Sequence, residues 1–217
     1  MKNRLLGCWV ICGVWLSAAV ATEPRNLSVL KQEIVAYVES GDYAAAINAV
    51  AKEATAFVTA RAAQRAPGER LAVVLDIDET ALTNLLHMRA LDFGYVPAAW
   101  DSWVAEGKAP AIAPVLEFFN AARRAGVEVV FITGRRERDR PGTEKNLRAA
   151  GYGDYAMLLL KPDGTKTSTE SFKTETRKKI QAGGRVIVAN IGDQASDLAG
   201  GYAERTFKVP GPFYQTK

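Results

Sequence analysis

The chain has 217 residues, of which 48% are hydrophobic and 24% are charged, and its formal net charge is +4. This composition excludes a disordered or fibrous chain and is typical of a folded domain of ordinary to large size. The basic residues are spread along the chain without a long Lys/Arg block. Charge therefore does not indicate binding to a nucleic acid polymer, and we expect none among the partners.

The N-terminal residues have the pattern of a secretory signal peptide. Lys2 and Arg4 form a positive start, the apolar stretch 5–16 follows, and residues 19–21 (Ala-Val-Ala) form a small-x-small cleavage site. We predict cleavage after this site, so that residues 1–21 are the signal peptide. The protein is then periplasmic or secreted.

Two alternatives to cleavage remain open. The first is a membrane anchor, but the apolar stretch is short for a span of ~20 residues, and we expect no stable membrane anchor. The second is lipidation at Cys8. Both cysteines, Cys8 and Cys12, lie within the predicted signal peptide. The predicted mature domain, residues 22–217, thus has no cysteine and must fold without disulfides.

Helical and strand patterns follow along the mature chain. Residues 28–63 have the apolar spacing and the high alanine content of a helical segment, with a predicted break at 40–42 (Ser-Gly-Asp). Residues 71–78 (LAVVLDID) begin with an unbroken apolar run, which is typical of a strand buried on both faces of a parallel sheet.

After this strand, helices and strands alternate. This order predicts an α/β protein with a Rossmann-like, mainly parallel sheet flanked by helices, preceded by the N-terminal helical segment. The predicted helices are 115–126, 139–150 and 169–183, and the further predicted strands are 127–135, 156–161, 185–193 and 205–210.

Residues 84–112 interrupt the alternation, and we interpret them as a small cap inserted after the first strand. The segment contains the single histidine, His87, and both tryptophans outside the signal peptide, Trp100 and Trp103. The tryptophans either stack on an aromatic substrate or pack the cap on the core. His87 either contacts substrate or has a structural role.

Polar side chains gather where the predicted strands end. In an open parallel sheet, ligands bind outside the carboxyl ends of the strands. Several carboxylates in one place repel one another, which predicts a divalent cation, and oxygen ligands favour a hard ion such as Mg²⁺. The residues in question are Asp76, Asp78, Thr80, Thr133, Gly134, Arg135, Asp193, Asp197 and a lysine from 161–173.

These residue types fit phosphoryl transfer. An aspartate can attack phosphorus and form an aspartyl-phosphate, while the metal and a lysine stabilise the charge of the transferring group. Thr133 can bind phosphate at the start of the following turn. Asp78 can protonate the leaving oxygen and then activate water.

Three motifs carry a family resemblance. Residues 76–80 (DIDET) resemble the DxDxT motif of the haloacid dehalogenase (HAD) superfamily, residues 131–135 (FITGR) its second motif, and residues 192–197 (GDQASD) its metal-binding motif. A closer similarity is to subfamily IIIB, which includes plant acid phosphatases, vegetative storage proteins and bacterial class B and C acid phosphatases. Residues 100–103 (WDSW), the run 143–152 and residues 205–210 (RTFKVP) carry this likeness.

The resemblance implies a role for each site residue. Asp76 would be the nucleophile and Asp78 the general acid and base. Mg²⁺ would bind to Asp76, Asp193 and the backbone carbonyl of Asp78. Asp197 would contact the metal through a water molecule, or would contact the ligands without touching the metal. Thr133, Gly134, Arg135 and a lysine would bind the phosphoryl group. For the lysine, Lys173 matches the family's helix start, and Lys161 is the alternative.

The sequence thus predicts a Mg²⁺-dependent acid phosphatase that hydrolyses small phosphate monoesters. Two alternatives stay open: a non-catalytic storage or binding protein on the same scaffold, and a phosphotransferase with an alcohol acceptor. One departure from the plant relatives is Ala195, where an aromatic residue is usual. Substrate identity and oligomeric state are not determined by these patterns.

Overall fold

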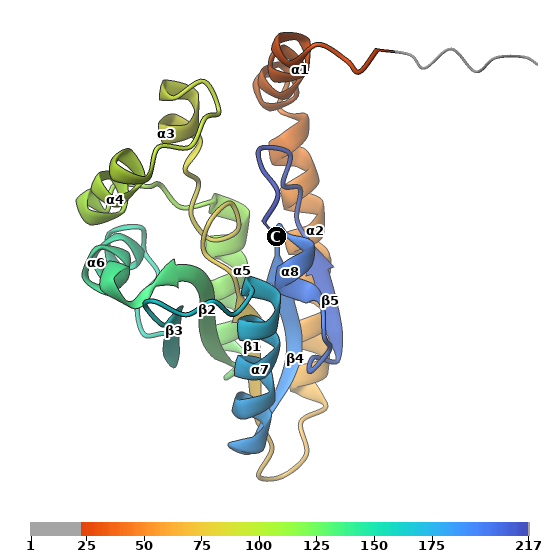
Figure 1. Cartoon of the computed structure of the whole chain (residues 1–217). Coiled ribbons are helices and arrows are strands. Elements are labelled where there is room, and N and C mark those ends of the chain that lie inside the picture. Colours follow the sequence, from red (N-terminus) through yellow and green to blue (C-terminus); the bar gives the residue numbers. More distant parts are fainter. Residues whose placement is uncertain (1–22, 217) are drawn as a thin grey trace, which may run out of the picture.

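A five-stranded sheet forms the centre of the molecule (Figure 1). The computed structural model describes residues 23–216. The spatial order of the strands is β3-β2-β1-β4-β5, and all neighbouring strands are parallel, which confirms the predicted fold class. The strands are β1 (Arg70–Leu75), β2 (Glu128–Arg136), β3 (Met157–Lys161), β4 (Arg185–Gly192) and β5 (Arg205–Lys208).

The predicted signal peptide, residues 1–21 with Cys8 and Cys12, lies outside the described residues. Cleavage after Ala21 and lipidation at Cys8 therefore stay predictions. Between residues 23 and 216, the helices are all too short or too polar to cross a membrane.

The central strand β1 is apolar throughout because both faces of the sheet are covered. Val73 and Leu75 face the larger hydrophobic cluster, to which α2 (Asp42–Ala63) and α5 (Ala113–Arg124) contribute. Val74 points to the opposite face and packs in a second cluster with Ile180. The unbroken apolar run in the sequence is the direct result of this double burial.

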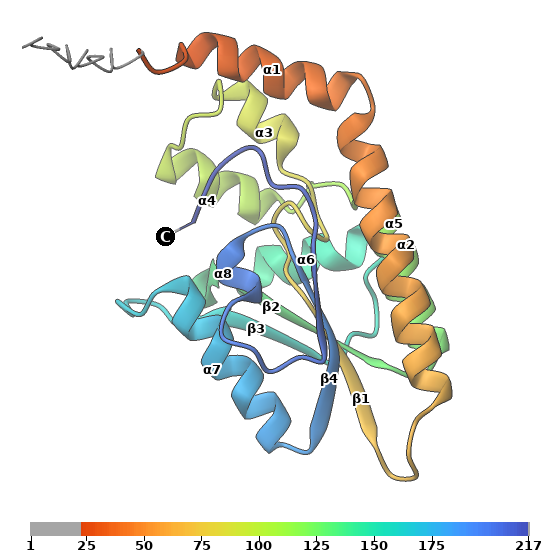
Figure 2. The ribbon, with the colours of Figure 1, turned by 90° about the vertical axis from the view of Figure 1, so that its right-hand side faces the viewer.

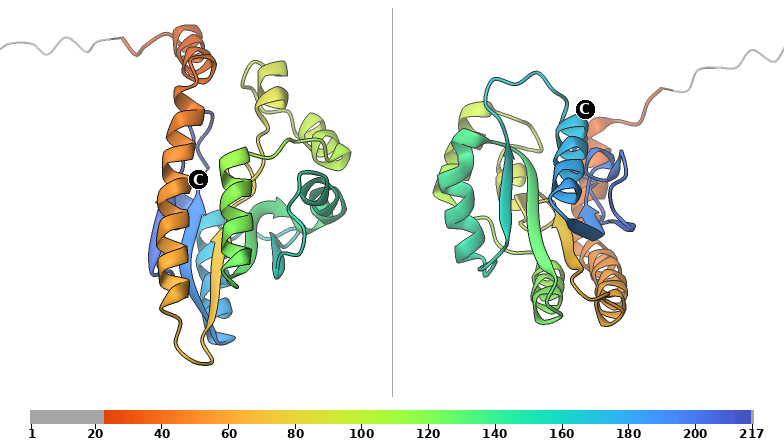
Figure 3. Two further views of the ribbon diagram at one scale, coloured as in Figure 1. Left: turned by 180° about the vertical axis from the view of Figure 1, so that it is seen from behind. Right: turned by 90° about the horizontal axis from the view of Figure 1, so that it is seen from below.

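Helices lie on both faces of the sheet, as the view from below shows (Figure 3). Ile180 belongs to α7 (Thr169–Ala182), which covers the face opposite to α2 and α5, with the short α8 (Ala195–Leu198) beside it. The 3₁₀ helix η1 (Glu137–Asp139) and α6 (Arg140–Ala149) follow β2.

The predicted break in the N-terminal helical segment is confirmed. The first helix, α1 (Leu27–Glu39), ends just before Gly41, which has a φ of +87°. Glycine adopts this left-handed conformation without a steric penalty, so the chain can turn sharply into α2. α1 then lies across the cap (Figure 2). Two ion pairs join α1 to the cap: Lys31 with Asp92, and Arg89 with Glu39.

The cap consists of α3 (Leu85–Ala90) and α4 (Pro97–Glu106), inserted between β1 and α5. Both helices lie beyond the carboxyl edge of the sheet (Figure 1). α4 packs closely on α6 because Gly142 has no side chain: a Cβ atom there would lie 2.3 Å from the carbonyl oxygen of Val104. The cap is thus seated directly over the edge where the predicted site residues gather.

Candidate active site

The chain makes a tight turn where β1 ends. The predicted strand 71–78 ends earlier, at Leu75, although the amide of Asp76 still donates to the carbonyl of Ile191 at 3.0 Å. The carbonyl of Ile77 then accepts from three amides, those of residues 80–82, and Glu79 has a φ of +57°. Asp76 and Asp78 consequently line a cavity, while Ile77 between them is fully buried in the core.

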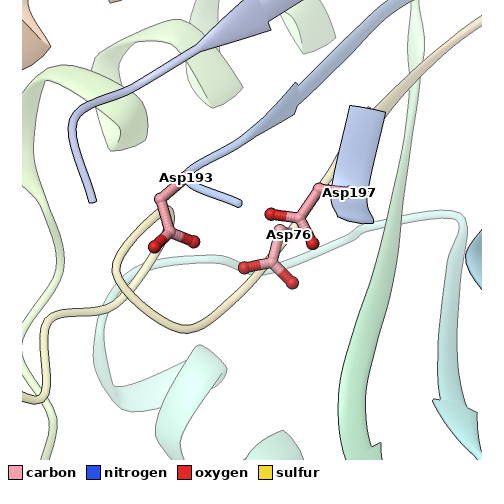
Figure 4. Close-up of side chains that lie close together, drawn as sticks. All are labelled: Asp76, Asp193 and Asp197. Carbon is pink, nitrogen blue, oxygen red and sulfur yellow. The ribbon is translucent and has the colours of Figure 1, made fainter. Parts of the chain in front are cut away.

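Three carboxylates meet beside this turn. Asp76, Asp193 and Asp197 each present one oxygen, and these oxygens lie within 4.8 Å of one another (Figure 4). Asp193 follows β4, the neighbour of β1, and Asp197 lies on α8. Gly192 allows the approach, since a Cβ atom there would lie 2.4 Å from Cβ of Asp197. The cluster lies at the position between β1 and β4 where the strand order reverses, which is the usual ligand site of such sheets.

Lys173 is inserted into this acidic cluster from α7. Its ammonium group donates to Asp76 and, at 2.7 Å, to Asp197. Burial alone would lower the pKa of Lys173, but Asp76 and Asp197 outweigh it and raise that pKa. Lys173 is therefore a permanently charged group at this site.

Lys161 occupies a different position. It ends β3, where burial and the charge of Arg136 lower its pKa. The structure thus brings Lys173, not Lys161, to the acidic cluster. Lys173 also lines the cavity.

The three carboxylates of the cluster are matched by only one cation among the described residues, Lys173. Burial raises the pKa of Asp76 well above its usual value, and the neighbouring carboxylates add to this while Lys173 opposes it. Burial, with the charge of Asp197, raises the pKa of Asp193 to about 7. Among the described residues Asp193 has no ion-pair partner, and its carboxylate accepts from Gln194 at 2.5 Å and Thr80 at 3.5 Å. A divalent cation bound by oxygen ligands would remove this surplus of negative charge.

Asp78 lines the same cavity but is not a member of the cluster, and it is held by two side chains. Arg135 donates from Nε to both carboxylate oxygens at 3.1 Å and from Nη2 to Oδ1 at 2.7 Å. Asn84 donates to Oδ1 at 2.9 Å. Burial would lower the pKa of Arg135, but Asp78 reverses the effect and raises it. The sequence assigned Arg135 to the phosphoryl group, and the structure pairs its guanidinium with Asp78.

The second motif forms another wall of the site. Gly134 and Arg135 line the cavity, and Thr133 is fully buried. The hydroxyl of Thr133 accepts from the amide of Arg135 at 3.1 Å. The hydroxyl of Thr143, on α6, accepts from Nη1 of Arg135 at 3.2 Å and so fixes the guanidinium from behind.

Two further residues of the run 143–152 hold the backbone around the site. The hydroxyl of Tyr152 donates to the carbonyl of Ala81 at 2.8 Å, just after the turn that carries Asp78. The side chain of Asn146 bonds to both the amide and the carbonyl of Ala109. The run thus supports the turn and the end of the cap.

The cavity has a volume of about 500 Å³. The sheet edge supplies its acidic floor, and the cap and the C-terminal segment supply walls rich in aromatic side chains. Those wall residues are His87, Met88, Phe93, Tyr95 and Trp100 from the cap, and Phe213, Tyr214, Gln215 and Thr216 from the C-terminal segment.

The sequence patterns did not predict that the C-terminal segment, residues 213–216, lines the cavity. The backbone carbonyl of Tyr214 accepts from Gln194 at 3.2 Å, and its hydroxyl donates to Glu79 at 3.3 Å. Phe213 packs against Tyr43 on α2 and Phe93 in the cap. No local pattern could reveal these contacts, because they join segments far apart in the sequence.

Glu79 is held by hydrogen bonds from the cap and the C-terminal segment. Its carboxylate accepts from the amide of Asn84 at 2.5 Å, from the Asn84 side chain at 3.0 Å and from Tyr214. Burial, with the charge of Asp78, raises the pKa of Glu79 to about 7. The group joins the turn, the cap and the C-terminal segment.

An open parallel sheet with a carboxylate cluster, a buried lysine and an inserted cap defines the class of HAD-type hydrolases. The family model described as "HAD superfamily, subfamily IIIB (Acid phosphatase)" matches residues 2–217. The chain belongs to this family, and its class of activity is phosphoric monoester hydrolysis. This confirms the resemblance that the three motifs carry.

Individual relatives agree with this assignment. The chain is 32% identical to the Stem 28 kDa glycoprotein of Glycine max over 216 residues, which covers 94% of this chain and 84% of that protein. It is 38% identical to Acid phosphatase 1 of Solanum lycopersicum over 147 residues, or 65% of this chain and 57% of that one. The fold is similar to the class C acid phosphatase of Bacillus anthracis, with a TM-score of 0.70, 23% identity and 87% of both chains covered.

Proposed function

We propose that this protein is a Mg²⁺-dependent acid phosphatase that hydrolyses small phosphate monoesters through an aspartyl-phosphate on Asp76. The observation that carries the proposal is the cluster of Asp76, Asp193 and Asp197 with Lys173 on the floor of a cavity of about 500 Å³. A cavity of this size accommodates a small ester rather than a polymer.

The donor set of the cluster fits Mg²⁺. All its side-chain donors are carboxylate oxygens, which this hard cation prefers over nitrogen and sulfur. We assign Asp76, Asp193 and the backbone carbonyl of Asp78 as ligands. The position of the Asp197 carboxylate within the cluster supports a role for it at the metal, directly or through water. When bound, the ion would neutralise charge on the phosphoryl oxygens.

Four groups would hold the phosphoryl group above Asp76. Lys173 is charged and already contacts Asp76, so it can bind an oxygen of the group while attack occurs. We assign Thr133, Gly134 and Arg135 to the remaining oxygens; Gly134 and Arg135 line the cavity.

In the first step, a carboxylate oxygen of Asp76 attacks phosphorus and the bond from phosphorus to the ester oxygen breaks. Asp78 gives its proton to that oxygen, and the alcohol leaves. In the second step, water gives a proton to Asp78 and attacks phosphorus, and the bond from phosphorus to the Asp76 oxygen breaks. Inorganic phosphate leaves, and both aspartates return to their starting states.

We also propose that the protein is exported to the periplasm or secreted. The signal-peptide pattern of residues 1–21 supports export. The name of the Stem 28 kDa glycoprotein agrees with it, since glycoproteins pass through a secretory route.

The direct test is turnover of p-nitrophenyl phosphate by purified protein with Mg²⁺ and with EDTA, and by the variant Asp76→Asn. We expect EDTA to stop turnover and Mg²⁺ to restore it. Asp76→Asn removes the attacking oxygen charge, so its kcat should fall at least about 10³-fold. Circular dichroism should show that the variant remains folded.

The same assay decides among the alternatives. Absence of metal-dependent turnover in the wild type would favour a storage or binding protein, and full activity of Asp76→Asn would overturn the role of Asp76. Glycerol added as an acceptor separates hydrolysis from phosphotransfer. A hydrolase releases equal amounts of phosphate and nitrophenol, whereas a phosphotransferase releases less phosphate than nitrophenol.

A further inference from the structure

Six side chains form a closed ring that begins and ends at Asp78. Two belong to the sheet edge, one to the start of the cap, and three to the cap helices α3 and α4. We call this set the cap ring. In order around the ring, its members are Asp78, Asn84, Trp103, His87, Trp100 and Arg135.

The first arm of the cap ring consists of hydrogen bonds. Asn84 is only 1% exposed, and its amide group donates to Asp78 at 2.9 Å and to Glu79 at 3.0 Å. Its amide oxygen accepts from Nε1 of Trp103 at 2.7 Å. Since the oxygen is occupied by the indole, the amide cannot flip without breaking several bonds. Trp103 therefore fixes which group of Asn84 faces Asp78.

The second arm of the cap ring runs through Arg135. The guanidinium group binds Asp78 through Nε and Nη2. The same group lies over the ring of Trp100, whose centroid is 5.6 Å from Cζ. A cation over an indole face is stabilised electrostatically. Trp100 thus confines the group that pairs with Asp78.

His87 joins the two arms. Its ring is stacked on Trp103, with a centroid distance of 5.5 Å and an interplanar angle of 22°. It meets the edge of Trp100 at 5.8 Å and 62°. The two tryptophans have different surroundings, since Trp100 lines the cavity and Trp103 packs against the hydrophobic core. They are coupled through His87, and both lead to one carboxylate.

We propose that the cap ring orients the carboxylate of Asp78 for proton transfer to the leaving group, with Asn84 and Trp103 as positioning residues. This inference rests on the proposed role of Asp78 as general acid. Its consequence is that the cap, besides enclosing substrate, sets the geometry of the acid. The competing interpretation is that the ring only attaches the cap to the core.

Leaving-group dependence separates the two interpretations. p-Nitrophenolate is stable as an anion and leaves with little help from an acid, whereas the alkoxide from glycerol 3-phosphate must be protonated as it leaves. A misdirected Asp78 lowers kcat/KM for the second reaction alone, because kcat/KM reports only the step in which the alcohol leaves. Hydrolysis of the aspartyl-phosphate, in which Asp78 serves both esters as base, affects kcat but not kcat/KM. A loosened cap alters both reactions alike, because binding of the common phosphoryl group and access to the site are disturbed for both.

The principal variant is Trp103→Phe, which keeps an aromatic ring and removes the N–H donor to Asn84. We expect kcat/KM for glycerol 3-phosphate to fall about 10-fold, a part of the roughly 10²–10⁴-fold that general acid catalysis contributes, and kcat/KM for p-nitrophenyl phosphate to fall less than about 2-fold. The matched control is Ser102→Ala, on the same helix, where the hydroxyl bonds only to the backbone of Ala98; this variant should behave as the wild type.

A double-mutant cycle with Asp78→Asn completes the test. Asp78→Asn should itself slow the glycerol ester far more than the nitrophenyl ester. If Trp103 acts through Asp78, then Trp103→Phe causes no further loss in that background. Equal losses on both esters, an undiminished loss in the Asp78→Asn background, or no loss at all would overturn the inference.

A second variant keeps the proposal testable if Trp103→Phe does not fold. Trp100→Leu removes the indole from Arg135 at a partly exposed position. Because Trp100 also lines the cavity, both esters can lose activity, but kcat/KM should fall about 3-fold more for the glycerol ester than for the nitrophenyl ester. Failure of the proposed function is recognised separately. In that case, wild-type protein shows no metal-dependent turnover of either ester, or Asp78→Asn affects both esters equally.

Discussion

The two ends of the parallel strands, the carboxyl edge and the amino edge of the sheet, differ in how their charged side chains are paired. At the carboxyl edge, Asp76, Asp193 and Asp197 are buried and Lys173 pairs with two of them. At the amino edge, the carboxylate of Glu128 lies between two guanidinium groups and is partly exposed.

This contrast distinguishes charge that serves the fold from charge that serves a ligand. Glu128 is matched by Arg70 and Arg185, which join β2, β1 and β4, so its ion pairs are complete within the protein. The carboxyl edge is left with surplus negative charge on buried side chains, which is unfavourable unless a cation binds. The predictions below test this difference, beginning with the largest effect.

The largest effect is expected from removing Lys173. Lys173→Met leaves Asp76 and Asp197 buried without their cation, and breaking a buried pair in this way costs about 3–5 kcal/mol. Urea unfolding in EDTA would measure the loss. The matched control is Lys161→Met, also at a buried lysine but away from the cluster, which should lose less than about 1 kcal/mol. Equal losses would show that Lys173 is an ordinary buried lysine.

Divalent metal should stabilise the protein by an amount that depends on the carboxyl edge alone. At a Mg²⁺ concentration 100 times the dissociation constant, the free energy of unfolding should rise by about 2.7 kcal/mol. Asp193→Asn removes a ligand that has no ion-pair partner among the described residues and should abolish most of this gain. Glu128→Gln, at the other edge, should retain it. A gain of the same size in Asp193→Asn would place the metal elsewhere.

The contrast between the edges also explains what the sequence could predict. Parallel strands that end together bring their following residues together, so Asp76, Asp193 and Asp197 could be assigned to one site from order and spacing alone. The fold class followed from apolar runs such as β1, whose residues alternate between two covered faces.

Other features of the site depend on side-chain packing that no pattern reports. The family resemblance favoured Lys173 over Lys161, but the sequence could not show which face of α7 is turned to the cluster. It assigned Arg135 to the phosphoryl group, and it could not show that the guanidinium also binds Asp78, where Trp100 and Thr143 contact it. Both cases involve long side chains whose direction is decided by residues from other elements.

The C-terminal segment shows the same limit at larger separation. Tyr214 reaches Glu79 across 135 positions of sequence. Nothing near Tyr214 in the sequence indicates this contact, since a single tyrosine in a loop has many equivalent environments. The floor of the cavity was therefore predictable, and much of its wall was not.

The smallest effect is expected at the amino edge, where Glu128→Gln removes one charge from a complete set of pairs. Burial would raise the pKa of Glu128, but the hydrogen bonds from Arg185 and Arg70 outweigh it, and the pKa lies below its ordinary value of 4.5. A carboxyl group whose pKa is lowered by folding stabilises the protein fully above its unfolded pKa, and this contribution is lost as the pH falls through the folded value. Because the group is partly exposed, the stabilisation should be less than about 1 kcal/mol. Urea unfolding near pH 7 should therefore show a small deficit for Glu128→Gln that shrinks as the pH falls below the ordinary pKa of the carboxyl group. The deficit should also shrink in high salt, because the pair is screened there. A deficit that persists unchanged at low pH would mean that packing of the side chain, and not its charge, stabilises this edge.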